Sequence, residues 1–183
     1  MKVVILSVVM MLAIWGPTTS HAVKVLAHST IINQQGDTIG EALYRQGRHG
    51  LLIEIQVAGL PPGMHGRHFH AVGVCSDTFN FKHSGGHIMT EGKPHGYLHM
   101  QGPHEGNLPN LIVHADGTAH VELYTELVSL HGHNGSLQLL DDDRSALVIH
   151  RDPDDHHSQP IGNSGPRIAC GVVNSMAPPP PIR

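Results

Sequence analysis

Apolar and polar side chains alternate along two segments of the chain, and this alternation predicts β-strands. In residues 51–58 an aliphatic side chain occupies every odd-numbered position, and residues 120–124 repeat the pattern around Val121 and Leu123. A period of two places alternate side chains on opposite faces of a strand, as expected where one face is buried. Asp116-Gly117 separates two strand-like runs, 111–115 and 118–124, and predicts a hairpin turn between them.

Short strands separated by glycine and proline account for much of the remaining chain. No segment keeps the 3.6-residue period of a helix for long, and residues 126–130 offer at most one helical turn. Two long segments, about 75–108 and 151–166, have no clear period, and loops of that length in a compact domain are usually functional or disordered. We therefore expect an antiparallel β-sandwich or β-barrel. The further predicted strands are residues 23–32, 39–46, 67–73, 136–140, 145–150 and 167–173.

The two ends of the chain differ from the strand-rich middle. Residues 1–22 contain one lysine, an apolar run over residues 3–15, and a small-x-small sequence at Ser20-His21-Ala22. This arrangement is typical of a cleaved signal peptide, because the apolar run is shorter than the ~20 residues of a membrane-spanning helix. A retained anchor is the alternative. We expect one domain over residues 23–175, beginning at Val23 after cleavage, and an extended proline-rich tail over residues 176–183.

Composition narrows the classes of partner. The formal net charge is −4 with only 11 Lys and Arg residues, and no basic patch stands out, which argues against a nucleic-acid partner. Cys75 and Cys170 are the only cysteines. In an exported chain a disulfide between them is the economical interpretation, and two free thiols are the alternative.

Eighteen histidines outnumber the three Phe, three Tyr and one Trp, so that imidazole is the main candidate for chemistry. Spacing alone proves nothing, because in a chain this rich in histidine any given pair spacing is expected about twice by chance. The chain indeed contains His-x-His at 68/70 and again at 131/133.

The orientation of side chains on strands is more informative. His68 and His70 lie on one face of a predicted strand and Phe69 on the other. His150 likewise lies opposite the apolar Leu147 and Ile149. If the apolar faces line the core, the three histidines stand outside the sheet, where long loops can cover them. Such a cluster predicts a copper or zinc site, with solvent-exposed histidines as the alternative.

A series of motifs then points to a known family. They are HGRHFHAVGVC at 65–75, GGH at 85–87, KPHG at 93–96, GPHEGNLPN at 102–110, VIHRDPDDH at 148–156 and GNSGPRIACGV at 162–172. Over nearly all of residues 23–173 the chain resembles the copper/zinc superoxide dismutase family, of the exported bacterial type. The resemblance implies an all-β Greek-key barrel or sandwich of about eight antiparallel strands, with two long functional loops, located in the periplasm or secreted.

The resemblance also implies a role for individual residues, with one copper and one zinc ion per subunit. Arg167 matches the arginine beside the open copper face, and Asp154 the carboxylate that links His68 to His95. Cys75 and Cys170 match the disulfide of the family. The implied copper ligands are His68, His70, His87 and His150, and the implied zinc ligands are His87, His95, His104 and the residue at position 107.

Position 107 departs from the family pattern. The family motif H-x-G-D-L ends in a zinc-binding aspartate, whereas this chain has Asn107. A neutral amide oxygen is a weaker ligand than a carboxylate for a doubly charged cation, and we expect weakened zinc binding. Glu105, His83 and His99 are candidate replacement ligands. The sequence assigns no role to His156 and His157.

The implied activity is the conversion of superoxide to dioxygen and hydrogen peroxide by copper that alternates between Cu(II) and Cu(I). His87 would deliver a proton, and Arg167 would hold the anionic substrate. One alternative is a non-catalytic copper- or zinc-buffering protein of the same fold, and another is catalysis by copper with the zinc site vacant. After signal cleavage no membrane association is expected, and the sequence does not choose between a homodimer and a monomer. His65 is expected to make a structural hydrogen bond, and His131 and His133 to face solvent.

Overall fold

A computed structural model describes residues 26–176 of the chain. The expected signal peptide and most of the proline-rich tail lie outside the described residues, as does the expected start at Val23. Nearly all regular structure in the described part is β-strand, and no helix there is long and apolar enough to cross a membrane.

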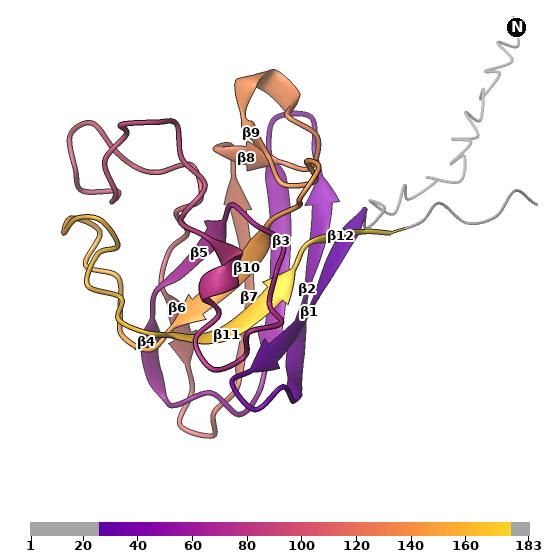
Figure 1. Ribbon diagram of the computed structural model, residues 1–183, viewed down its shortest axis with the longest axis vertical. Coiled ribbons are helices and arrows are strands. Elements are labelled where there is room, and N and C mark those ends of the chain that lie inside the picture. Colours follow the sequence, from indigo (N-terminus) through magenta and orange to yellow (C-terminus); the bar gives the residue numbers. More distant parts are fainter. Residues whose placement is uncertain (1–25, 177–183) are drawn as a thin grey trace, which may run out of the picture.

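The main element is a curled, eight-stranded antiparallel sheet (Figure 1). Along it the strands follow the order β5-β10-β11-β1-β2-β3-β7, and β12 pairs with β1 beyond the end of β11. The arrangement agrees with the expected Greek-key barrel or sandwich. The strands of this sheet are β1 (Ala27–Asn33), β2 (Thr38–Gln46), β3 (Leu51–Val57), β5 (Arg67–His70), β7 (Ala119–Thr125), β10 (Ala146–His150), β11 (Arg167–Val172) and β12 (Asn174–Ser175).

Two small sheets and two 3-10 turns complete the regular structure of residues 26–176. The antiparallel pair is β4 (Gly63–His65) with β6 (Leu111–Val113), and the parallel pair is β8 (Val128–Ser129) with β9 (Leu137–Gln138). The 3-10 turns are η1 (Lys82–Ser84) and η2 (His133–Gly135). The predicted helical turn at residues 126–130 is wrong, because Val128 and Leu130 are fully buried and the extended chain between them pairs with β9.

The hairpin prediction is half right. A turn closes at Asp116-Gly117, where His114 N–H donates to the Thr118 carbonyl and Gly117 adopts a φ of +81°. The strands on either side then separate, because β6 pairs with β4 whereas β7 pairs with β3. A local turn signal therefore located the reversal of the chain but not the strands' partners.

The sheet has an apolar inner face and a different outer face at its β5–β10 end. Phe69, Leu147 and Ile149 lie in the main core, as the alternation predicted. Val148, on the opposite face of β10, packs in a second, smaller apolar cluster with Phe81. Residues 71–110 and 151–166 form the two long loops, and both extend on the same side of the sheet, next to β5 and β10 (Figure 1).

Candidate metal centre

Strands β5 and β10 bring three histidines together outside the core. In the antiparallel register His68 lies opposite Val148 and His70 opposite Ala146, so the imidazoles of β5 share the outer face with His150 at the end of β10. The ring centroids of His68 and His150 are 4.9 Å apart, and those of His70 and His150 are 5.7 Å apart. The three side chains are buried because the long loops cover them.

The first long loop adds a fourth imidazole. His87 is joined to His70 by an isolated antiparallel bridge, and its ring centroid lies 4.0 Å from that of His68. One ligand atom from each of His68, His70, His87 and His150 lies within 4.8 Å of all the others. We call these four residues the histidine quartet.

Hydrogen bonds fix which nitrogen each ring of the quartet offers. Nδ1 of His70 lies 2.9 Å from the Gly85 carbonyl, and Nδ1 of His150 lies 3.0 Å from the Gly165 carbonyl. A carbonyl oxygen only accepts, so both Nδ1 atoms carry the proton and both Nε2 atoms present lone pairs. Within the quartet, the buried ring nitrogens without a hydrogen-bond partner are His68 Nδ1, His70 Nε2, His87 Nε2 and His150 Nε2. Four converging, unpartnered nitrogens fit a copper ion.

A second cluster shares one residue with the first. His87, His95 and His104 also place ligand atoms within 4.8 Å of one another, and Nδ1 of His87 lies 3.2 Å from Nδ1 of His104. We call these residues the histidine trio. His87 thus contributes its unpartnered Nε2 to the quartet and its Nδ1 to the trio. A tetrahedral zinc ion needs one more ligand than the trio supplies.

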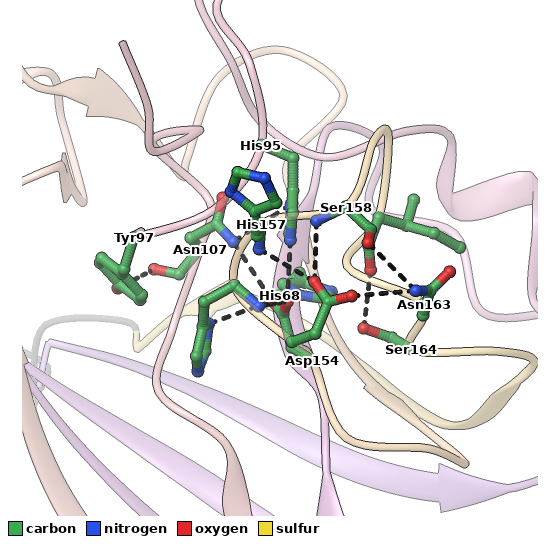
Figure 2. A network of polar contacts seen from close by, with 12 residues as sticks. His68, His95, Tyr97, Asn107, Asp154, His157, Ser158, Asn163 and Ser164 are labelled. Carbon is green, nitrogen blue, oxygen red and sulfur yellow. Dashed lines mark hydrogen bonds and ion pairs between the residues drawn. The ribbon is translucent and has the colours of Figure 1, made fainter. Parts of the chain in front are cut away.

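Asp154 links the two clusters (Figure 2). Its Oδ2 accepts from His68 Nε2 at 2.8 Å, and its Oδ1 accepts from His95 Nε2 at 2.9 Å. Burial opposes ionisation of the carboxyl, but the hydrogen bonds from His68 and His95 outweigh it and lower the pKa of Asp154. An ionised Asp154 holds both imidazoles with the proton on Nε2 and leaves a lone pair on Nδ1 of each ring.

Burial keeps the imidazoles of the quartet neutral. Desolvation lowers the pKa of His150 to about 3 and the pKa of His70 well below its ordinary value. It also lowers the pKa of His87, with the neighbouring histidines adding to the effect. Neutral imidazole is the form that binds a metal, so these rings can accept a cation without first losing a proton.

A cation and a disulfide lie beside the quartet. The guanidinium of Arg167, on β11, donates to the carbonyls of Phe81 and Gly85, both at 2.7 Å, and to Ser84 Oγ at 3.0 Å. Cys170 follows on the same strand and forms a disulfide with Cys75, as the sequence predicted. The bond ties the first long loop to the strand that carries Arg167.

Comparison with known proteins decides the family. The family model for copper/zinc superoxide dismutase matches residues 38–173. The chain belongs to the copper/zinc superoxide dismutase family. A superoxide dismutase (Cu-Zn) of Caulobacter vibrioides is 44% identical over 139 residues, which are 75% of this chain and 79% of the relative. Superoxide dismutase (Cu-Zn) 1 of Aquifex aeolicus is 40% identical over 156 residues, 84% of this chain and 90% of the relative.

Solved structures agree with this family fold. The crystal structure of a superoxide dismutase-like protein from Bacillus subtilis matches with a TM-score of 0.74 and 37% identity, covering 79% of this chain and 96% of that one. Cu/Zn superoxide dismutase from Brucella abortus matches at 23% identity with a TM-score of 0.63, covering 81% of this chain and 99% of that one. The latter likeness supports the fold alone.

Within the superoxide dismutase fold, sequence reasoning missed two amide side chains that brace the site. Asn110 accepts from Asp154 N–H and donates to its carbonyl, both at 2.8 Å. In the same way, Gln159 accepts from His95 N–H at 2.8 Å and donates to the His95 carbonyl at 2.9 Å. Asn110 is the last residue of the family motif at 102–110, and this position in the motif was the one feature of the sequence that could have indicated its role. Nothing in the sequence marked Gln159.

A glycine in the second loop explains part of a motif. Gly162 has a φ of +61°, and a Cβ at this position would overlap the Asp154 carboxylate and lie 2.6 Å from His95 Nε2. The absence of a side chain lets the loop close over the Asp154–His95 hydrogen bond.

The remaining candidate residues are not brought into either cluster. Glu105 instead accepts from Lys93 and Thr90, each at 2.9 Å. His83 is exposed beside Asp77, and the His99 ring lies 5.9 Å from that of His157. Among residues 26–176, no group of three or more close metal-binding side chains includes Glu105, His83 or His99.

The other histidines singled out from the sequence behave as expected. His65 is buried, with its ring nitrogens 2.8 Å from the carbonyls of His150 and Pro61, which confirms a structural role. His131 and His133 are exposed.

Proposed function

We propose that this protein is a superoxide dismutase that holds copper in the histidine quartet and zinc in the histidine trio, with His87 shared. The overall reaction takes two superoxide anions and two protons to one dioxygen and one hydrogen peroxide. The observation that carries the proposal is the convergence of four buried, unpartnered imidazole nitrogens at the quartet. Membership of the family supplies the reaction.

Copper supplies the electron transfer, because copper held by nitrogen ligands alternates between Cu(II) and Cu(I), whereas zinc has one oxidation state. The protein supplies the geometry. His68, His70 and His150 keep their lone pairs directed at one point through hydrogen bonds on their far nitrogens. Held this way, the ligands need little rearrangement when the charge of the site changes.

His87 is the proposed proton donor. Its Nε2 faces the quartet and has no protein partner. Its Nδ1 belongs to the histidine trio, so a neutral His87 ring whose Nδ1 binds zinc can hold its single proton at Nε2, on the side of the quartet. Proton transfer from a positioned histidine to a leaving anion is general acid catalysis.

Arg167 is the proposed binding group for superoxide. The chain has a formal net charge of −4, so its overall field repels an anion, and capture depends on a local cation. Three hydrogen bonds to the first long loop hold the guanidinium in place, and the arginine remains charged although burial lowers its pKa.

The zinc site is proposed to be weaker than in relatives that have aspartate at position 107. Three imidazoles and a neutral amide offer zinc no negative charge in direct contact. After mild dialysis the protein should retain less zinc than an Asn107→Asp variant, as measured by elemental analysis. Equal retention contradicts the proposal.

The protein is further proposed to be exported to the periplasm or secreted, with residues 1–22 removed and one domain over 23–175. A disulfide, which persists in oxidising compartments, and the leader-like residues 1–22 support this. Mass analysis of the mature protein should give an N-terminus at Val23. A mature protein that keeps Met1 contradicts cleavage.

Superoxide consumption by the metal-loaded protein tests the function. The wild-type protein loaded with copper and zinc should consume superoxide rapidly, and His70→Ala should lose both copper and activity. His131→Ala, which alters an exposed histidine outside the clusters, is the matched control and should retain both. Stoichiometric copper without turnover in the wild type would instead favour a metal-buffering protein.

A further inference from the structure

Asn107 does more in this site than replace a zinc ligand. The residue is fully buried, and its Nδ2 lies 3.2 Å from His95 Nδ1 and 3.4 Å from Asp154 Oδ2 (Figure 2). His95 donates from Nε2 to Asp154, so its neutral ring has a lone pair on Nδ1. The two amide protons of Asn107 therefore meet two acceptors, and they close a network that runs from Asn107 through His95 and Asp154 to His68.

A carboxylate at position 107 has the opposite effect in the absence of zinc. It has no proton to donate, so it faces the lone pair of His95 and the negative charge of Asp154 at the distance where Asn107 now donates. Two carboxylates that share a buried site repel strongly, and a cation between them or a proton on one of them relieves the repulsion. Asp154 and His68, which depends on it for its orientation, would then be held in place only when zinc is bound or one of the two carboxyls is protonated.

The unpartnered Oδ1 of Asn107 adds a second consequence. To offer this oxygen to zinc, the amide must turn over and give up the hydrogen bonds that Nδ2 makes to His95 and Asp154. Zinc binding therefore competes with the network in this protein, whereas it would reinforce the network if position 107 were aspartate.

We infer that Asn107 is a positioning residue that prepares the copper-binding quartet in the absence of zinc. The amide holds Asp154, and through it His68, in the binding geometry while no zinc is bound. The inference rests on the proposed function in taking the quartet as the copper site.

Copper affinity measured with and without zinc tests this coupling. Cu(II) is titrated against a competing chelator at neutral pH, using zinc-free and zinc-saturated protein. The wild-type affinity should not rise on zinc binding, whereas in Asn107→Asp zinc should raise it roughly tenfold, within the usual range of coupling between sites. Gln35→Glu, which adds the same charge in the exposed turn between β1 and β2, should behave as the wild type.

A second variant covers the case in which Asn107→Asp does not fold without metal. Asn107→Ala removes the donor without adding charge, and its zinc-free copper affinity should fall below that of the wild type. The inference is overturned if zinc raises the wild-type copper affinity as much as that of Asn107→Asp, or if the zinc-free affinity of Asn107→Ala equals that of the wild type. Wild-type protein whose copper affinity does not rise with zinc, as expected, but which shows no superoxide turnover would overturn the proposed function alone.

Discussion

At the scale of single residues, function depends on where protons reside. His70 and His150 each give Nδ1–H to a backbone carbonyl, and His68 gives Nε2–H to Asp154. Each contact fixes one tautomer and leaves the other nitrogen as a lone pair directed at the same point. The hydrogen bonds on the far side of the rings thus matter as much as the ligand atoms themselves.

Arg167 allows a prediction at this scale. Arg167→Ala should lower the rate of superoxide consumption and flatten its dependence on ionic strength, because the local positive charge that offsets the net negative field is lost. The copper content should stay the same, because Arg167 contacts the loop and not the quartet nitrogens. Arg167→Lys, which keeps the charge, should recover part of the rate. An unchanged rate of Arg167→Ala at low salt would contradict the assignment.

At the scale of elements, the site consists of two rigid strands and two loops that must be held against them. Strands β5 and β10 pair directly and fix His68, His70 and His150 through their register. The loops have no such ladder, and separate side-chain and backbone hydrogen bonds join them instead. Gln159, in the second loop, bonds both backbone polar groups of His95 in the first, and Leu98 N–H donates to the His156 carbonyl at 2.9 Å.

The Gln159 contact can be tested by a loop substitution. Gln159→Ala removes both hydrogen bonds to His95 and should release zinc several-fold faster to a chelator, because the loop that carries His95 can open more often. Gln101→Ala is the matched control, since this exposed side chain makes no hydrogen bond in the described structure. Equal release rates of the two variants would show that the contact does not hold the loop.

At the scale of the whole molecule, one face of the sheet builds the core and the other builds the site. The disulfide joins the first long loop, which forms part of the site, to strand β11 of the sheet, across a sequence separation of 95 residues. Closing a loop of that size stabilises the folded state by about 4.7 kcal/mol in the chain-entropy account. The molecule needs such support, because the quartet buries polar rings whose nitrogens have no protein partner.

Those buried rings make the stability of the metal-free protein depend on pH. The pKa of His150 is about 3 in the folded protein against about 6.5 in an unfolded chain, so between these values the unfolded state binds a proton that the folded state does not. The free energy of unfolding should therefore be constant above pH ~6.5 and fall at lower pH, by up to ~1.4 kcal/mol per pH unit for each such histidine.

Denaturant unfolding of the metal-free protein at pH 7.5, 6 and 5 measures this slope. His150→Gln should reduce it, and the exposed His131→Gln should leave it unchanged. Stability that does not vary between pH 7.5 and 5, or a slope equally shallow in the wild type and in His150→Gln, would show that burial of His150 does not control the titration.

The sequence alone predicted most strands of the main sheet and the side of that sheet on which the first three histidines lie. Strand periodicity is a local property, so the opposition of His68 and His70 to Phe69 could be read without knowing any partner strand. The family motifs then indicated the other histidines of the two clusters, together with Arg167, Asp154 and the cysteine pair. The separate partners of β6 and β7 and the pairing of β8 with β9 were not predictable, because both depend on contacts distant in sequence.

Only the tertiary structure decided how the loops complete the site. The two-sided use of His87, the backbone contacts of Asn110 and Gln159, and the direction of the Asn107 amide all depend on loops without a repeating pattern. Loop conformation follows from many specific hydrogen bonds and close approaches, such as that of Gly162 to Asp154, and no local rule encodes these. The sequence showed that Asn107 departs from its family, and the structure showed that its amide protons complete the network behind the metal site.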